Sequence, residues 1–418
     1  MIASTPGLME AVRGRFAHVE TCPFEGERIF FESAGGALRL KSVIETSAAY
    51  AGYPDNQGRD NPASGALMET IARGKADMRL FFNAPGGQVF VGESGTEVLF
   101  RLIRTAALGA AEGGRMLGST LEHPASVSAM TRWADVTGRE LIRVAHDDAS
   151  GTVKAEAYRK HLTPDLRVVS IVHTSPVTGM TVDVGAIIAE VRAVAPECFI
   201  VVDGIQHASH GAVDVGGIGA DGYAVSPYKM FSRHGYGVGW ASDRLSGCPK
   251  EQILGGAAEN WELGTRDTGA YATFSDVVAY LEWLGGQVSD AGDRRALLEA
   301  AGHAIAEQEA MLMRGALSGV GNLPGLKDMP GVQLIGGDAV EGREGVVSLR
   351  IEGMESGALV SHLRAHGIRV HIRKNDHYCG NILGPLGLED CVRVSLSHYN
   401  TEDELRRFLT VMKDVTGG

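Results

Sequence analysis

Apolar and polar positions alternate between about residues 85 and 245 in a way that predicts strands and helices in turn. Five short stretches read as strands, and the last four are apolar on both faces, as strands buried in a parallel sheet are. They lie at 88–92, 141–145, 168–174, 198–204 and 222–226.

Two longer stretches between these strands carry apolar residues at helical spacing. In 94–111, Val98, Leu99, Leu102 and Ile103 fall on one face. The stretch 184–196 has a similar stripe, which Pro196 ends. Strands that alternate with helices predict an α/β domain with a mainly parallel sheet.

The last hundred residues have a different pattern. The stretches 344–353 and 391–400 predict strands of the antiparallel type, with a helix between them at 356–367. Thr401 and Glu404 have capping-box spacing at the start of a closing helix. We therefore expect a large domain over 20–300 and a smaller α+β domain made of 1–19 and 301–418, joined by a helical region at about 270–315.

Composition narrows the class of protein. The 418 residues carry a formal net charge of −12, which argues against a nucleic-acid or anionic-membrane partner. No apolar stretch reaches the roughly 18 residues that span a bilayer. The five cysteines form no CxxC pair, and the first residues lack the apolar core of a secretory signal. We expect a cytoplasmic protein without a metal site.

The segment "GESGTEV" is a candidate anion site. Ser94 and Glu97 have capping-box spacing, so a helix is expected to begin here directly after a strand. The N–H groups of Gly95 and Thr96, the Thr96 hydroxyl and the helix dipole would then form a phosphate cradle. The alternative is a cap that serves only its own helix.

Three further side chains are placed where α/β proteins bind ligands. Asp203 ends a predicted buried strand, at the edge where such ligands lie. His123 follows another strand and could lie flat on an aromatic ligand, or be a structural histidine. Lys229, in "SPYKMFSRHGYG", stands among small, polar and backbone-exposing residues. It is either a solvated turn lysine or an amine held ready for a covalent bond.

A phosphate cradle, a stacking histidine, an aspartate at a strand end and a lysine, in this chain order, are typical of a pyridoxal phosphate site. A lysine forms the internal aldimine, and a carboxylate keeps the pyridine nitrogen protonated so that the ring acts as an electron sink. The amine of Lys229 must lose its proton to attack an aldehyde, so its pKa must fall towards neutrality. Arg233 is expected to contribute to that fall.

On these motifs the chain resembles the class V branch of fold-type-I pyridoxal phosphate enzymes, above all the cysteine desulfurase and selenocysteine lyase group. The resemblance runs from "FFESAGGAL" near the start to "VRVSLSHYNTEDEL" near the end. It implies the fold type I transferase fold, with a large mainly parallel-sheet domain and a smaller α+β C-terminal domain. It also implies a catalytic lysine at Lys229, a partner for the pyridine nitrogen at Asp203, and a stacking ring at His123.

The same resemblance assigns the remaining contacts. Gln206 would reach the phenolic oxygen of the cofactor, and Arg393 would bind the α-carboxylate of the substrate, near Ala34 and Gly35. The phosphate would be held by Gly95, Thr96 and Ser226. The segment "WELGTRD" is similar to one that crosses to the other subunit, where Thr265 would complete the phosphate site of the neighbour. The chain is therefore expected to form a homodimer with shared active sites.

Three positions depart from the desulfurase pattern. Ser175-Pro176 stands where desulfurases have Ser-Asn, so one contact to the cofactor is missing. Tyr228 replaces the histidine before the lysine and could bind the phosphate or touch the substrate. Cys379 falls near the place of the sulfur-accepting cysteine, but in a longer and different loop. It is catalytic or a bystander, and a catalytic role needs an exposed thiol with a depressed pKa.

The expected reaction acts on a small amino acid through an external aldimine. We favour cysteine desulfurase-like C–S lyase or β-elimination chemistry, in which the β-substituent leaves or passes to Cys379. The alternative is a class V aminotransferase that uses Lys229 for a proton shift and a keto acid as acceptor. A racemase, a decarboxylase or a non-catalytic cofactor-binding module is less favoured. The sequence does not name the substrate.

Overall fold

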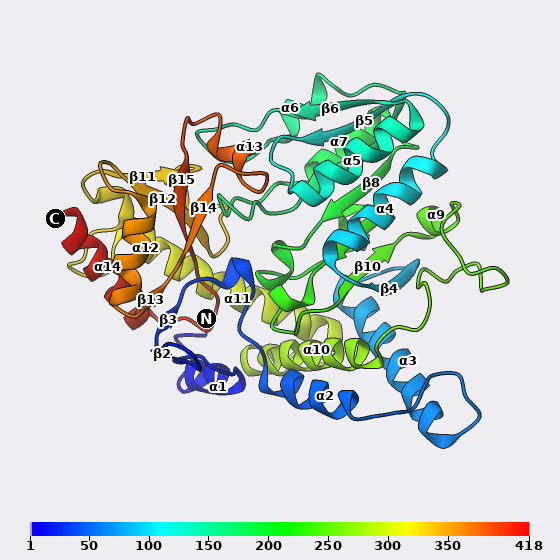
Figure 1. Cartoon of the computed structure of the whole chain (residues 1–418), viewed down its shortest axis with the longest axis horizontal. Helices are drawn as coiled ribbons and strands as arrows, with labels where there is room; N and C mark the ends of the chain where they lie inside the picture. The colour runs from blue at the N-terminus through cyan, green and yellow to red at the C-terminus, as the bar shows by residue number, and fades with distance from the viewer. Residues whose placement is uncertain (1, 418) are drawn as a thin grey trace.

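The computed structural model describes residues 2–417, and within them the strands form a large and a small sheet (Figure 1). The predicted small domain includes residues 1 and 418, which lie outside the described part. The large sheet has seven strands, which are listed here in spatial order: β4 (Gln88–Gly92), β10 (Gly237–Ala241), β9 (Gly222–Val225), β8 (Phe199–Asp203), β7 (Leu166–Val172), β5 (Arg115–Ser119) and β6 (Glu140–Val144).

The large sheet is mainly parallel, as predicted, with one reversed strand. Strand β10 pairs antiparallel with both β4 and β9, and the pairs from β9 to β6 are parallel. Because two reversals cancel, β4 points the same way as β9. The carboxyl ends of six strands therefore share one edge, where ligands of α/β proteins bind.

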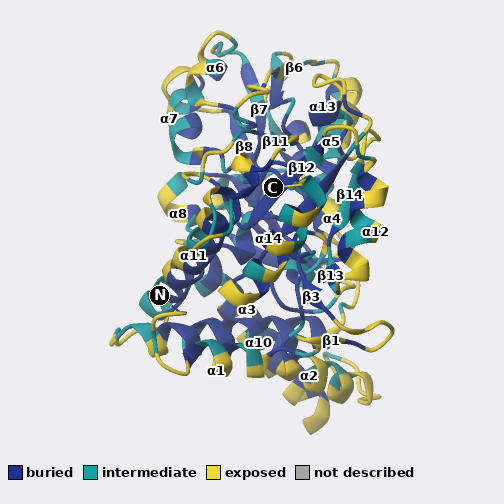
Figure 2. Cartoon of the chain, turned by 90° about the vertical axis from the view of Figure 1, so that its left-hand side faces the viewer, coloured by how far each residue is buried: buried dark blue, intermediate teal, exposed yellow. Residues whose placement is uncertain are grey.

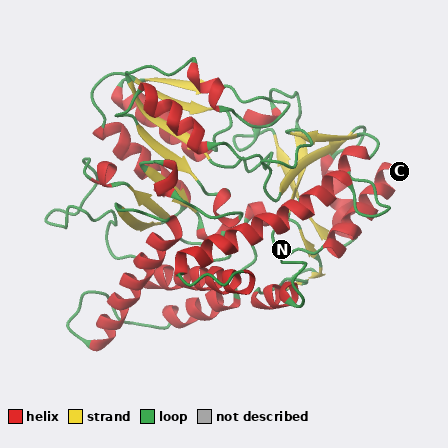
Figure 3. Cartoon of the chain, turned by 180° about the vertical axis from the view of Figure 1, so that it is seen from behind, coloured by secondary structure: helices red, strands yellow, loops and turns green. Residues whose placement is uncertain are grey.

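The two faces of the large sheet bury alternate residues of its central strands, which is why these strands are apolar on both faces. The strand predicted at 141–145 forms as the edge strand β6, but it is not buried on both faces, because only Val144 of its residues is buried. Val168 and Val201 pack into one core, beneath helices α4 (Gly95–Gly109) and α5 (Pro124–Thr137). Val169 and Val202 pack into the other. On that face lie α3 (Pro62–Phe82), α7 (Val184–Val194) and α10 (Thr268–Val288). Figure 3 shows strands enclosed by helices, and Figure 2 shows them as the buried centre of the molecule.

The small sheet is antiparallel throughout, as expected. Its strands, in spatial order, are β11 (Val332–Ile335), β12 (Val346–Ile351), β15 (Asp390–Ser395) and β14 (His371–Lys374). Three helices share its core: α11 (Arg294–Ser318), α12 (Ser356–Ala365) and α14 (Glu402–Thr416). The predicted capping box of Thr401 and Glu404 is present at the start of α14.

The remaining elements are short or lie at the margins of these layers. They are α1 (Leu8–Arg15), β1 (Thr21–Cys22), β2 (Gly26–Glu27), β3 (Ile29–Phe30), α2 (Lys41–Ala51), α6 (Ala155–Arg159), α8 (Val215–Ile218), α9 (Asp243–Ser246), β13 (Ile368–Arg369) and α13 (Gly380–Leu383). Strand β3 pairs with β13, so the early segment runs beside the C-terminal part. The division into 20–300 and the rest stays a prediction.

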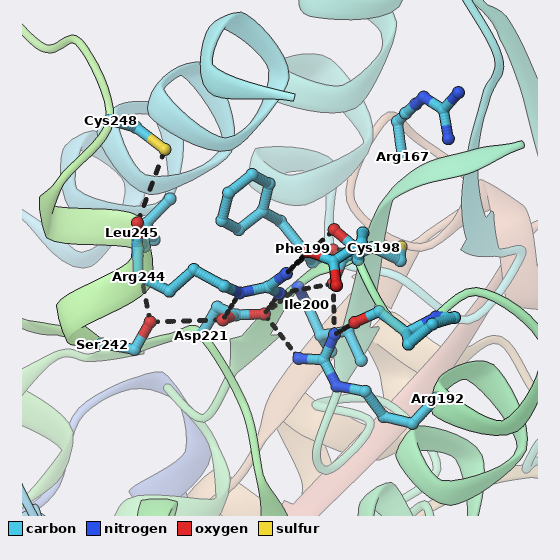
Figure 4. A network of polar contacts seen from close by, with 12 residues as sticks. Arg167, Arg192, Cys198, Phe199, Ile200, Asp221, Ser242, Arg244, Leu245 and Cys248 are labelled. Carbon is cyan, nitrogen blue, oxygen red and sulfur yellow. Dashed lines mark hydrogen bonds and ion pairs between the residues drawn. The ribbon is translucent and has the colours of Figure 1, made fainter. Parts of the chain in front are cut away.

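The amino ends of β8 and β9 are tied together at the edge opposite to the ligand edge (Figure 4). Asp221, which is 3% exposed, precedes β9 and accepts a hydrogen bond from the Ile200 N–H of β8 (2.9 Å). Arg192 and Arg244 each donate to the same carboxylate at 2.7 Å. These donors satisfy the buried carboxylate and tie the start of β9 to β8.

Candidate active site

One cavity gathers most of the residues that the sequence singled out. It is lined by Thr96, His123, Val172, Thr174, Pro176, Asp203, Ile205, Gln206, Ser226, Tyr228 and Lys229. These residues follow the carboxyl ends of β4, β5, β7, β8 and β9. The parallel sheet thus brings together side chains from five strand ends, which no spacing in the sequence could guarantee.

Lys229 lies at the end of a 3-10 turn, Pro227–Lys229, directly after β9. Its Nζ donates to Gln206 Oε1 at 3.0 Å. Burial and the Arg393 charge lower the pKa of Lys229 to about 7, against the opposing pull of Asp203. Arg233, which we expected to contribute, instead pairs with Asp267. A substantial fraction of the amine is therefore neutral near pH 7, the state in which it attacks a carbonyl.

The chain turns sharply after Lys229 at a residue that is not glycine. Phe231 adopts a left-handed φ of 69°, which costs about 1 kcal/mol or more for a residue with a side chain. Its ring is fully buried and packs edge-on against Phe16 (5.5 Å between centroids) and His398 (5.0 Å). This packing holds the strained turn in place and so fixes the backbone position of Lys229.

Asp203 ends β8 and is 3% exposed. Its carboxylate accepts from the Ile205 N–H at 3.1 Å and from Ser126 Oγ at 3.4 Å. Burial raises the pKa of Asp203, although the Ile205 N–H and Lys229 oppose this. Two weak donors leave a buried carboxylate poorly compensated, so a cationic N–H of a ligand would fit against it. Ser126 carried no distinguishing sequence signal.

His123 caps helix α5 and is neutral. Its Nδ1 accepts from the Ala125 N–H at 3.1 Å. Burial, Lys229 and Arg373 lower the pKa of His123 to about 4. A neutral ring can lie against an aromatic ligand without the cost of burying a charge. Tyr378, which the sequence did not single out, lies with its ring 6.0 Å from that of His123.

The predicted phosphate cradle is built at the start of α4. Ser94 caps the helix by accepting a hydrogen bond from the Glu97 N–H at 3.1 Å. The Glu97 carboxylate accepts from the Glu93 N–H, one residue before the cap, rather than from Ser94 itself. A side chain at Gly95 would collide with Ser226 Oγ and with Ile205. The glycine therefore lets a hydroxyl from the end of β9 reach the helix N-terminus, where a phosphate would bind.

Tyr228 lies between the lysine and the small domain. Its ring stacks on His234, with 4.4 Å between the centroids. A Cβ built at Gly36 would lie 3.4 Å from the Tyr228 ring, so the glycine allows the ring its place. The ring borders the cavity, and both of its expected roles stay predictions.

Arg393, on β15, is the predicted carboxylate binder and is 3% exposed. One Nη atom donates to the Pro176 carbonyl at 3.0 Å, and Nε has no hydrogen-bond partner among residues 2–417. Gly35 lies against its guanidinium, with 3.4 Å between an ideal Cβ and Nη2. Ala34 is held by the Ser395 hydroxyl at 3.0 Å. A buried guanidinium with unused donors is suited to a carboxylate ligand.

The loop before Cys379 is exposed at residues 374–378, but the cysteine itself is not. It is fully buried at the start of α13, and Arg373 Nε donates to its Sγ at 2.9 Å. Burial raises the pKa of Cys379, and Arg373 opposes that rise. Asn381 on α13 donates to the Thr120 carbonyl at 2.7 Å, so this segment docks on the loop that carries His123. The Cys379 thiol therefore belongs to a segment that packs against the cavity loop, and its raised pKa favours the neutral thiol.

Thr265 lies apart from this cavity. It is exposed in the loop between α9 and α10 and does not line the cavity with the other predicted phosphate ligands. Its neighbour Arg266 pairs with Glu93, directly before the cradle, at 3.2 Å, but among residues 2–417 no hydrogen bond joins Thr265 itself to the cradle. Its role in the phosphate site of a second subunit stays a prediction.

The side chains fit pyridoxal phosphate. Gly95, Thr96 and Ser226 leave room and donors for a phosphate, and Asp203 lacks a strong partner of its own where a pyridinium N–H would reach it. Lys229 lines the same cavity and supplies an amine whose pKa is lowered to about 7. The donor set is thus complementary to both ends of that cofactor.

The chain was compared with known proteins. The sequence profile of the aminotransferase class-V family matches residues 29–408. A probable cysteine desulfurase of Xylella fastidiosa is 26% identical over 93% of this chain and 90% of its own. An aminotransferase-like protein of Gibberella zeae is also 26% identical, over 99% of this chain and 100% of its own.

Among solved structures, the apo cysteine desulfurase of Thermococcus onnurineus has a TM-score of 0.80 with this chain, at 21% sequence identity. The match covers 98% of each chain. This likeness confirms the predicted fold. Within residues 2–417 no helix is long and apolar enough to cross a bilayer.

Proposed function

The chain belongs to the aminotransferase class-V family, and we propose that it is a pyridoxal phosphate-dependent C–S lyase of the cysteine desulfurase type. Enzymes of this family use pyridoxal phosphate. One observation carries the proposal: a Lys229 whose pKa is lowered to about 7, a poorly compensated Asp203 and a neutral His123 line a single cavity at the carboxyl edge of the sheet.

The cofactor would be held at three points. Gly95, Thr96 and Ser226 would bind its phosphate, Asp203 its pyridine nitrogen, and Gln206 its phenolic oxygen. His123 would cover one face of the ring. When bound, the cofactor supplies an electron sink that weakens the bonds to the α-carbon of an amino acid.

Residues of this chain would bind the substrate, transfer its α-proton and shield the thiol from water. Arg393 would bind and orient the substrate carboxylate through the donors that it leaves unused. Lys229 would take a proton from the α-carbon and return it, because an amine with a pKa of about 7 can do both near neutral pH. Cys379 itself would be shielded from water, because its thiol is buried beneath a loop whose preceding residues, 374–378, are exposed.

Cys379 is the proposed sulfur acceptor. Its Sγ would form an S–S bond with the substrate sulfur as the C–S bond breaks, and the former β-carbon would gain a proton, so that cysteine becomes alanine and the protein a persulfide. Arg373, at 2.9 Å, would stabilise the thiolate that this attack requires.

We also propose a cytoplasmic homodimer with shared sites. The loop between α9 and α10 exposes Ile253 (58%) and Leu254 (102%) beside Thr265. Exposed aliphatic residues on such a loop suit burial against a second copy. Thr265 would then complete the phosphate cradle of the neighbour.

A second candidate is an aminotransferase. Two observations favour it: one relative over the full length of the chain is named aminotransferase-like, and burial raises the pKa of the Cys379 thiol. In this case Lys229 and Arg393 keep their roles, and Cys379 has none.

The two are separated by adding L-cysteine, then other amino acids, to purified protein without a keto acid. Alanine and sulfide or persulfide, lost in Cys379→Ser but kept in the remote Cys248→Ser, support the lyase. If cysteine is inert and another amino acid gives a keto acid and a stable amine form of the cofactor that pyruvate reverses, the protein is an aminotransferase.

A further inference from the structure

A line of four side chains leads from the active-site amine into the interior of the protein. Lys229 Nζ donates to Gln206 Oε1 at 3.0 Å, and Gln206 Nε2 lies 3.1 Å from His210 Nε2. The other ring nitrogen of His210, Nδ1, lies 2.6 Å from Glu309 Oε2. Glu309 is carried by α11, 99 residues further along the chain.

The inner end of this line is a buried histidine–carboxylate pair. The side chains of His210 and Glu309 are 2% and 3% exposed. Burial raises the pKa of Glu309, and His210 opposes that rise. Burial opposes a charge on His210, but the Glu309 and Glu344 carboxylates outweigh it and raise the pKa of His210 to about 9. His398, which also faces His210, stays neutral, because burial and the His210 charge lower its pKa to about 3.

The amide of Gln206 joins the two ends and has one acceptor oxygen and one donor nitrogen. When its oxygen faces Lys229, its NH₂ faces His210 Nε2, which must then carry no proton. When Nε2 is protonated, the amide must turn so that its oxygen accepts from His210. Its NH₂ then faces Nζ, which must be a neutral amine.

A charge at both ends would leave one buried N–H without an acceptor, which is unfavourable. The two orientations of the amide therefore correspond to one proton placed at either end of the line, exchanged with solvent rather than passed along it. The groups that face Lys229 directly are Arg393, Asp203, Arg373 and His123. None of them contacts the Gln206 amide with a hydrogen bond among residues 2–417.

We propose that Lys229 and His210 share one exchangeable proton through the Gln206 amide, and that Glu309 is the fixed anion that draws it to His210. His210 and Glu309 are then positioning residues that keep the Lys229 amine neutral without touching substrate or cofactor. The inference rests on the proposed function in one respect, because it takes Lys229 as the reactive amine.

The test measures the protonation of Lys229 itself in protein freed of any bound carbonyl compound. Reductive methylation with formaldehyde and cyanoborohydride reacts with neutral amines, and peptide mass spectrometry reads its rate at Lys229 against pH. In Glu309→Gln and in His210→Leu, we expect the midpoint of this rate to rise by about one pH unit, because the proton returns to Lys229.

His207 provides the matched control. It pairs with Glu344 as His210 pairs with Glu309 (Nδ1 to Oε1, 2.5 Å), but no hydrogen bond joins it to Gln206 among the described residues. His207→Leu should shift the midpoint much less, because it reaches His210 only through the charge of Glu344. An unchanged midpoint in Glu309→Gln, which keeps the shape of the side chain, overturns the proposal even if His210→Leu fails to fold. An equal shift in His207→Leu overturns it as well.

The outcome is independent of the proposed reaction. If the midpoint shifts as expected but cysteine is not desulfurated, the proton-sharing line stands and the lyase assignment fails. If cysteine is desulfurated and the midpoint does not move, only the proton-sharing line fails.

Discussion

Replacing Lys229 by methionine should stabilise the cofactor-free protein, and by an amount that depends on pH. The pKa of this amine falls from 10.5 to about 7 in the folded protein, chiefly because of burial. A folded pKa below the unfolded one means that the unfolded chain binds more protons between these two values. The buried amine therefore lowers the free energy of unfolding by its full amount below about pH 7, and this effect fades as the pH rises towards 10.5.

One pKa unit corresponds to about 1.4 kcal/mol, so the cost falls by about 2 kcal/mol between about pH 7 and about pH 9. Lys229 is partly exposed to the cavity, and solvent screening makes this an upper value. Lys229→Met has no titrating amine. Its advantage in unfolding free energy over the wild type should therefore shrink by up to that amount across this range.

Urea unfolding of both proteins, stripped of cofactor, at the two pH values measures this difference. The exposed Lys154 serves as control, because Lys154→Met removes a lysine that is not buried. A difference between wild type and Lys229→Met that stays constant with pH would refute the reasoning that the amine is held neutral by the fold.

Three further outcomes follow from single contacts. Asp221→Asn should lower the free energy of unfolding by about 3 kcal/mol in urea titrations, because two arginines lose their buried counter-charge. Activity at saturating substrate should be retained where that variant is folded. Arg393→Lys should raise KM for the amino acid by about tenfold or more and change kcat less, since a lysine cannot offer a bidentate pair; an unchanged KM would count against the clamp. Gly95→Ala should weaken retention of pyridoxal phosphate in equilibrium dialysis, because the added methyl collides with Ser226 Oγ and with Ile205; unchanged retention would count against the cradle.

The sequence predicted those parts of the fold whose residues are buried in a regular pattern. The strand ending at Asp203 is apolar on both faces, and the sheet buries it on both faces, so its prediction was confirmed. Strand β10 was not predicted, because Gly237 and Gly239 make it read as a loop. Those glycines are needed because side chains there would strike the backbone of Ser94 and the ring of Phe90.

The candidate site was predictable where a residue follows a strand and not where it depends on packing between distant segments. Lys229 and Asp203 stand at strand ends, and the parallel sheet places both in one cavity. The burial of Cys379 depends on how its loop docks against Thr120, which no local pattern encodes. Glu309 lies on a helix far along the chain from His210, so only the fold brings the two together.

The most direct test of the central claim is to reduce the purified protein with borohydride in the presence of pyridoxal phosphate and to map the labelled peptide by mass spectrometry. The account predicts one phosphopyridoxyl group, on Lys229, with Lys229→Met unlabelled. A label that falls on another lysine, or its absence from a protein that is folded, would contradict the assignment of this cavity as a pyridoxal phosphate site.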